Sequence, residues 1–111
     1  MSTINYNQRR FRLASEGTDG TLFHYHQTGD VVWITYEGGT VIYGQAIAKA
    51  DSEGKLDLRY QHVTTNDLIQ TGSCITTPEV LADGRLRLTE VYQPTSGNQA
   101  DGISIAEEVR D

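Results

Sequence analysis

The chain has 111 residues, of which 15 are acidic and 9 basic, so its formal net charge is −6. This length fits a single domain over residues 1–111 and is too short for two. The acidic balance excludes nucleic acid and anionic lipid as expected partners, because both require clustered Lys and Arg. No run approaches the roughly 20 apolar residues of a membrane span, and no apolar stretch typical of a secretory signal follows the N-terminus, so we expect a cytoplasmic protein.

Short segments with alternating apolar and polar residues, separated by turn residues, indicate an almost wholly β-sheet chain. A first strand at 10–14 is optional, and the further expected strands are 21–27, 31–37, 40–50, 55–64, 68–76, 85–93 and 103–109. Gly29-Asp30 and Gly38-Gly39 are typical of tight hairpin turns. Pro78 is expected to end its strand, and 77–84 to form a longer connection with room for one helical turn.

These short connections predict an all-β, antiparallel up-and-down meander of seven to eight strands. Such a sheet leaves two exposed edges unless it curls and closes. We therefore expect a small barrel of the lipocalin or avidin type, with an open two-layer β-sandwich as the alternative.

Two of the expected strands change from aliphatic to polar residues along their inward faces. Leu56 and Leu58 are followed on the same face by Tyr60 and His62, and Leu86 and Leu88 are followed by Glu90 and Tyr92. In a meander the two strands run parallel, so their polar ends meet at one end of the barrel. Gln70, early in the intervening strand, and Tyr43, early in its own, would join the group if they face inward. The candidate ligand-binding residues are Tyr43, Tyr60, His62, Gln70, Glu90 and Tyr92.

This constellation suits hydrogen bonding to a small polar ligand between tyrosine walls, so the first hypothesis is a non-enzymatic binding barrel. A purely structural polar cluster is the plain alternative, because small barrels fill their interiors with mutually bonded side chains. An interaction or assembly module, as a homodimer or a complex subunit, is the second hypothesis. Acid–base catalysis by His62 and Glu90 is the third.

Other residues are given structural roles. Cys74, the one cysteine, is expected to be a small buried apolar filler. Trp33 is expected in the core, and His24 and His26 on a half-exposed strand face rather than on a metal. The phosphate-loop, dinucleotide, nucleophile-elbow and zinc motifs are missing from the sequence, so no cofactor is expected.

Several segments together resemble a small family of β-rich bacterial proteins of about this length. The resemblance rests on strand and turn features that run from Phe23-His24-Tyr25 through Tyr36-Glu-Gly-Gly39, Leu58-Arg-Tyr-Gln-His62, Gly72-Ser-Cys74, Thr77-Pro78-Glu79, Asp83 to Glu90, and Ser96-Gly97. Members of this family often carry the label N-acetylglutamate synthase, and the resemblance implies that activity here. The residues themselves favour the binding hypothesis, because no Gly-rich loop opens a helix that could hold the pyrophosphate of acetyl-CoA.

Overall fold

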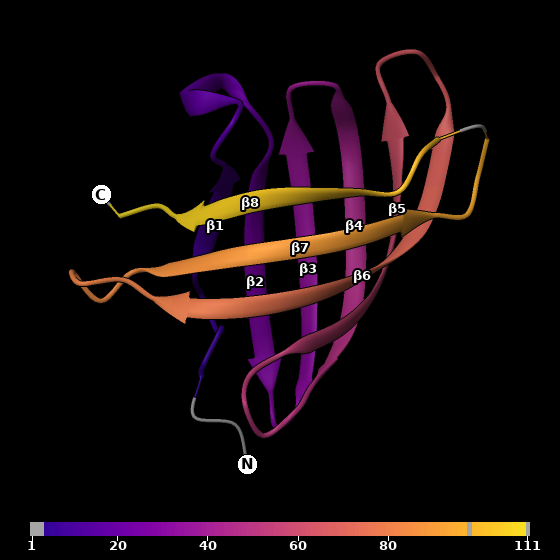
Figure 1. Cartoon of the computed structure of the whole chain (residues 1–111). Helices are drawn as coiled ribbons and strands as arrows, with labels where there is room; N and C mark the ends of the chain where they lie inside the picture. Colours follow the sequence, from indigo (N-terminus) through magenta and orange to yellow (C-terminus); the bar gives the residue numbers. More distant parts are fainter. Residues whose placement is uncertain (1–3, 98, 111) are drawn as a thin grey trace.

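A computed structural model describes residues 4–97 and 99–110 as one closed, eight-stranded antiparallel barrel (Figure 1). Each strand pairs with the next along the chain, and β1 also pairs with β8. The strands are β1 (Arg10–Leu13), β2 (Leu22–Thr28), β3 (Val31–Gly38), β4 (Val41–Ala50), β5 (Leu56–Thr64), β6 (Ile69–Val80), β7 (Leu86–Pro94) and β8 (Gly102–Glu108). This confirms the predicted barrel, and the optional first strand is the one that closes it.

Tight turns join the strands, as the glycine pairs predicted. Gly38 and Gly39 between β3 and β4 have φ values of 110° and 59°, which side-chain-bearing residues adopt rarely. A Cβ on Gly38 would lie 2.9 Å from the carbonyl oxygen of Gly20, so the connection before β2 packs against this turn.

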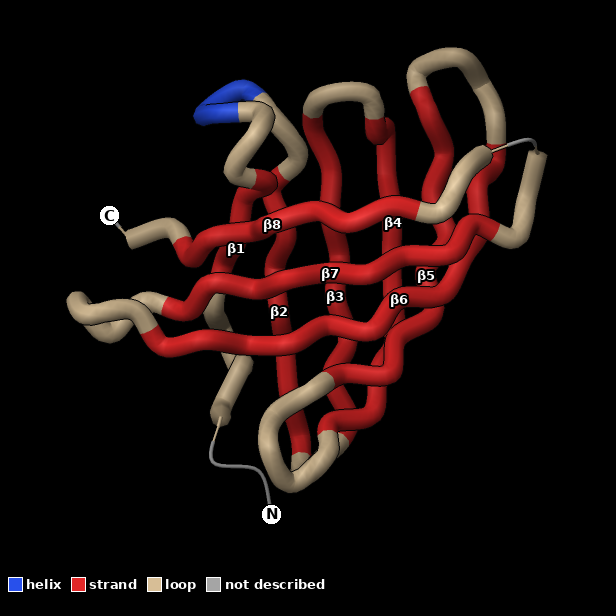
Figure 2. Tube along the Cα trace, viewed as in Figure 1, coloured by secondary structure: helices blue, strands red, loops and turns tan. Residues whose placement is uncertain are grey.

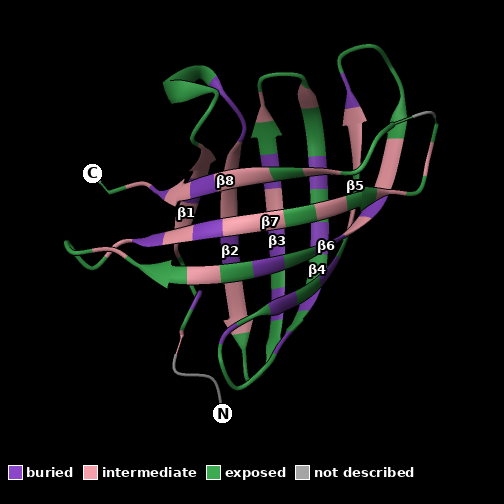
Figure 3. Ribbon diagram, in the orientation of Figure 1, coloured by how far each residue is buried: buried purple, intermediate pink, exposed green. Residues whose placement is uncertain are grey.

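Period-two alternation places one face of every strand inside the barrel. Figure 3 shows buried and exposed residues alternating along the ribbons. The buried core comprises Tyr6, Phe11, Tyr25, Val32, Ile34, Tyr36, Ala46, Ala48, Ala50, Leu56, Leu58, Cys74, Leu86, Leu88 and Ala106.

The prediction that Pro78 ends a strand was wrong. β6 continues through Pro78, which pairs with Leu88 of β7, and ends at Val80. Pairing between β5 and β6 ends at Leu56 and Thr76, so beyond that point β6 has a free edge, where a residue without an N–H is tolerated. No helical turn forms in 77–84; the short 3₁₀ helix η1 (Gly17–Asp19) lies between β1 and β2 instead (Figure 2, blue).

The prediction of a core position for Trp33 was also wrong. Its neighbours Val32 and Ile34 are buried, so Trp33 faces outward and is 40% exposed. Its ring stacks on that of His26 from β2, with 5.6 Å between the centroids. Cys74, by contrast, is buried as predicted.

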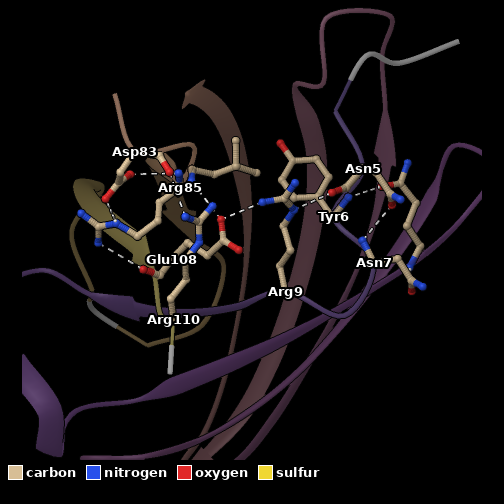
Figure 4. Close-up of polar contacts among 10 residues, drawn as sticks. Asn5, Tyr6, Asn7, Arg9, Asp83, Arg85, Glu108 and Arg110 are labelled. Carbon is tan, nitrogen blue, oxygen red and sulfur yellow. Dashed lines mark hydrogen bonds and ion pairs between the residues drawn. The ribbon is translucent and has the colours of Figure 1, made fainter. Parts of the chain in front are cut away.

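The N-terminal segment seals one end of the barrel. Tyr6 is fully buried, stacks on Tyr25, and donates a 2.6 Å hydrogen bond from its hydroxyl to the carbonyl oxygen of Gly54. Arg9 forms a 2.7 Å ion pair with Glu108, whose same oxygen accepts a hydrogen bond from the backbone N–H of Leu86 (Figure 4). Strands β7 and β8 and the N-terminal segment are thereby joined at this end.

Within the described ranges, no helix has the length and apolarity needed to cross a bilayer.

Tyr6→Phe tests this seal, because it removes the hydroxyl and leaves the Gly54 carbonyl without that donor. We expect the free energy of unfolding to fall by about 1–2 kcal/mol, the usual cost of a lost buried hydrogen bond. Tyr43→Phe is the matched control, since Tyr43 is 51% exposed, and should change stability by less than about 0.5 kcal/mol. Urea denaturation measures both, and equal effects would contradict the assignment.

Candidate functional site

The opposite end of the barrel holds an open cavity of about 400 Å³. The connections that follow β1, β3 and β7 contribute to its rim, whereas the N-terminal segment lies at the other end. Its walls are mainly aromatic and polar, and the lining residues are Leu13, Glu16, Thr21, Phe23, Tyr25, Ile34, Tyr36, Thr40, Val41, Ala46, Leu58, Tyr60, His62, Gln70, Cys74, Glu90, Tyr92, Pro94, Gln99, Ala100 and Ser104.

The structure brings five of the six sequence-predicted site residues into this cavity: Tyr60, His62, Gln70, Glu90 and Tyr92.

Tyr43 does not meet the condition under which it would join them, because it faces outward. The pairing of β4 with β5 changes register between Val41 and Tyr43, so Val41 reaches the cavity while both Ile42 and Tyr43 are exposed. A β-bulge of this kind interrupts alternation.

His62 is held at both ring nitrogens. Its Nε2 lies 2.9 Å from Oε1 of Gln70, and its Nδ1 lies 2.9 Å from the hydroxyl of Tyr36. An amide oxygen only accepts, so Nε2–H donates to Gln70, while Nδ1 and the hydroxyl of Tyr36 share a second hydrogen bond. The ring also stacks almost parallel on Tyr60, with centroids 5.7 Å apart. Burial raises the pKa of Tyr36 well above its usual value, so its hydroxyl stays protonated at neutral pH.

Glu90 lies on β7, which pairs with β6, the strand that carries Gln70. Its Oε1 accepts a 3.1 Å hydrogen bond from the hydroxyl of Ser104, its neighbour on β8. Desolvation raises the pKa of Glu90 to about 7, although the Ser104 hydrogen bond acts in the opposite direction. No Lys or Arg is among the described residues that line the cavity. Glu90 is therefore poised between its neutral and ionised forms near neutral pH.

Cys74 lines the cavity without the character of a nucleophile. Burial raises the pKa of its thiol to about 11, and its sulfur lies 3.6 Å from the hydroxyl of Thr76. A thiol that stays protonated at neutral pH is a poor nucleophile.

Three tyrosines of the cavity each lie over a glycine of the next strand. Tyr36 is paired with Gly44, Tyr60 with Gly72, and Tyr92 with Gly102. A Cβ on any of these glycines would lie 2.2–2.3 Å from the nearest tyrosine atom. The missing side chains thus allow the rings to lie along the wall, which leaves the middle of the barrel open.

Sequence reasoning missed Tyr36 and Ser104. The signal for Tyr36 was present: Val32, Ile34 and Tyr36 share the inward face of β3, which runs parallel to β5 and β7 and makes the same change from aliphatic to polar. Ser104 becomes visible only through the register that places it opposite Glu90.

The desolvated Glu90 should make the fold less stable as pH rises. Its pKa is about 7 in the folded protein against an ordinary value of 4.5, so between these values the folded state keeps a proton that the unfolded state has lost. The resulting stabilisation, at most about 3 kcal/mol, is complete below the lower value and disappears as pH rises through the upper one.

We therefore expect the difference in unfolding free energy, wild type minus Glu90→Gln, to fall between about pH 5 and pH 8. Urea denaturation at each pH measures it. The exposed Glu37 of β3 supplies the control, since Glu37→Gln makes the same charge change outside the barrel and should give a flat difference. A flat difference for Glu90→Gln would contradict the assignment.

Comparison with known proteins agrees with this architecture. A search of curated proteins and a search of solved structures gave no match. A protein-family model described as "Avidin-like protein" matches residues 4–109, which span all eight strands and the cavity. The match confirms a β-rich family, whereas the N-acetylglutamate synthase activity implied by the resemblance stays a prediction. The chain belongs to the avidin-like family.

Proposed function

We propose that this protein is a non-enzymatic binding barrel that holds one small ligand of mixed polarity in its open cavity. The observation that carries this proposal is the cavity itself, with polar groups converging between aromatic walls at one end of a barrel sealed at the other.

The size and the lining of the cavity support binding. Its volume of about 400 Å³ lies in the range of small-molecule sites, which are mostly apolar with a few placed polar groups. An eight-stranded barrel has room for one such ligand. Membership of the avidin-like family points the same way and makes biotin a reasonable first probe.

The bonding pattern favours binding over acid–base catalysis. Both ring nitrogens of His62 are engaged by Tyr36 and Gln70, and Glu90 is bonded to Ser104. A general acid–base pair needs direct contact or one bridging water at a shared substrate, and within the described residues these two groups have separate partners.

NMR titration of ¹⁵N-labelled protein with a panel of biotin and small cationic, anionic and neutral aromatic compounds tests the proposal. At least one compound should shift the resonances of cavity residues such as Tyr60 and Gln70. The variant His62→Ala with Glu90→Ala should lose this response. The matched control, His24→Ala with Glu37→Ala, makes the same substitutions on the outer face and should keep it. Shifts confined to outer-face residues, or none, would refute cavity binding.

A specific feature of the outer surface favours assembly as a second candidate function. Ile75 of β6, Val91 of β7 and Ile103 of β8 are direct cross-strand neighbours and are exposed by 48%, 46% and 68%. Adjacent exposed β-branched side chains form an apolar row of the kind that interfaces cover.

Light scattering after size exclusion tests this second candidate. Assembly through the row predicts a dimer or larger oligomer that Val91→Lys converts to a monomer. A monomeric wild type at about 100 μM, well above the dissociation constants of stable oligomers, would exclude it.

A further inference from the structure

The electrostatics of the cavity narrow the chemistry of its ligand, provided that the cavity binds a ligand as proposed above. Its described lining residues include two carboxylates, Glu90 within the barrel and Glu16 at the rim, and no Lys or Arg. Four arginines form ion pairs with carboxylates that do not line the cavity: Arg9 with Glu108, Arg59 with Asp57, Arg85 with Asp83, and Arg87 with Glu79 and Glu107. A positive charge inside the cavity would therefore have to come from the ligand.

Glu90 has unused capacity as a hydrogen-bond acceptor. An ionised carboxylate offers about four lone-pair sites, and Ser104 occupies one of them, on Oε1. No described side-chain oxygen is both fully buried and without a partner, so the other oxygen of Glu90 remains accessible from the cavity. Glu16 also accepts one hydrogen bond on its Oε1, from the backbone N–H of Thr21, but unlike Glu90 it is exposed to solvent.

Aromatic rings line the same cavity as this carboxylate. The ring centroids of Phe23 and Tyr36 are 4.8 Å apart, and Tyr60 and Tyr92 follow on β5 and β7. Ring faces attract cations through their quadrupoles, with tyrosine among the effective partners. A cationic group and an apolar group of one ligand thus both find complementary surfaces here.

We propose that the ligand is a small organic cation, an amine or amidinium attached to an apolar group, whose N–H donates to the carboxylate of Glu90 while the apolar part lies between the tyrosine rings.

Binding of such a cation is coupled to the release of a proton. The described groups that face Glu90 are Ser104 on β8, Thr76 and Cys74 on β6, Tyr25 on β2 and Tyr36 on β3. Burial raises the pKa of both tyrosines and of Cys74, so these three groups stay neutral near pH 7, whereas the pKa of Glu90 itself is raised to about 7. A bound cation stabilises the ionised form of Glu90, so the free protein releases a fraction of a proton on binding.

Three probes of nearly equal shape test the inference: 2-phenylethylamine as the cation, 2-phenylethanol as the neutral analogue, and phenylacetate as the anion. Isothermal titration at pH 7.5 should show the amine binding at least about tenfold more tightly than the alcohol, as a charge-assisted hydrogen bond provides. Glu90→Gln should reduce this preference to less than about twofold, whereas Glu37→Gln should preserve it.

Two further measurements use only the wild type, so the test stands even if Glu90→Gln fails to fold. Affinity for the amine should rise about tenfold from pH 6 to pH 8 as Glu90 ionises, because the amine keeps its proton throughout. Titration in buffers of different ionisation enthalpy should show proton release with the amine and none with the alcohol.

The outcomes separate this inference from the proposed function. The cationic ligand is overturned if the alcohol or phenylacetate binds as tightly as the amine or more tightly. It is also overturned if a neutral or anionic member of the NMR panel binds while the amine does not. In both cases the protein is still a binding barrel. Failure of every probe and every panel compound to bind the cavity refutes the proposed function itself.

Discussion

The open cavity depends on one steric constraint, the pairing of large rings with residues that have no side chain. The interior of an eight-stranded barrel is so narrow that side chains alone would nearly fill it. Tyr36, Tyr60 and Tyr92 would occupy the centre of that space if a neighbour pushed them inward. Each instead lies over a glycine at its cross-strand position. Glycine weakens a strand through its backbone freedom, so three such glycines carry a cost in stability that the aromatic rings partly offset by covering the exposed backbone.

The two ends of the barrel differ in how their polar groups are buried and bonded. At the closed end, Tyr6 and leucines of β5 and β7 are almost fully buried, and Arg9 and Glu108 join the N-terminal segment to the last strand. At the open end, His62 is fixed between two partners, while Glu90 is desolvated with one described hydrogen bond. A desolvated carboxyl group such as that of Glu90 lowers the stability of the fold at neutral pH. Such perturbed groups in cavities are typical of functional sites.

Alternation and turn chemistry were sufficient to predict the barrel and the cavity-lining position of five of the six candidate residues, because period two fixes which side chains face inward and a meander fixes which strands run parallel. The errors arise where a local irregularity or the tertiary context decides. The bulge in β4 turns Tyr43 outward, and the free edge of β6 accepts Pro78. Trp33, the sole tryptophan, follows its strand's alternation, with buried Val32 and Ile34 on either side, and therefore lies on the outer face. The hydrogen bond of Ser104 to Glu90 depends on register, which the sequence does not specify across a long connection.

Native mass spectrometry of the gently purified wild type and of Gly72→Ala tests most directly the claim that the tyrosine–glycine pairs keep a binding cavity open. In Gly72→Ala the added methyl would lie 2.2 Å from the hydroxyl of Tyr60 and drive the ring into the cavity. The account predicts a small-molecule mass retained by the wild type and lost or strongly reduced in Gly72→Ala, and restored when Tyr60→Leu is added to relieve the collision. A wild type that carries no small molecule, or equal retention by both proteins, would contradict it.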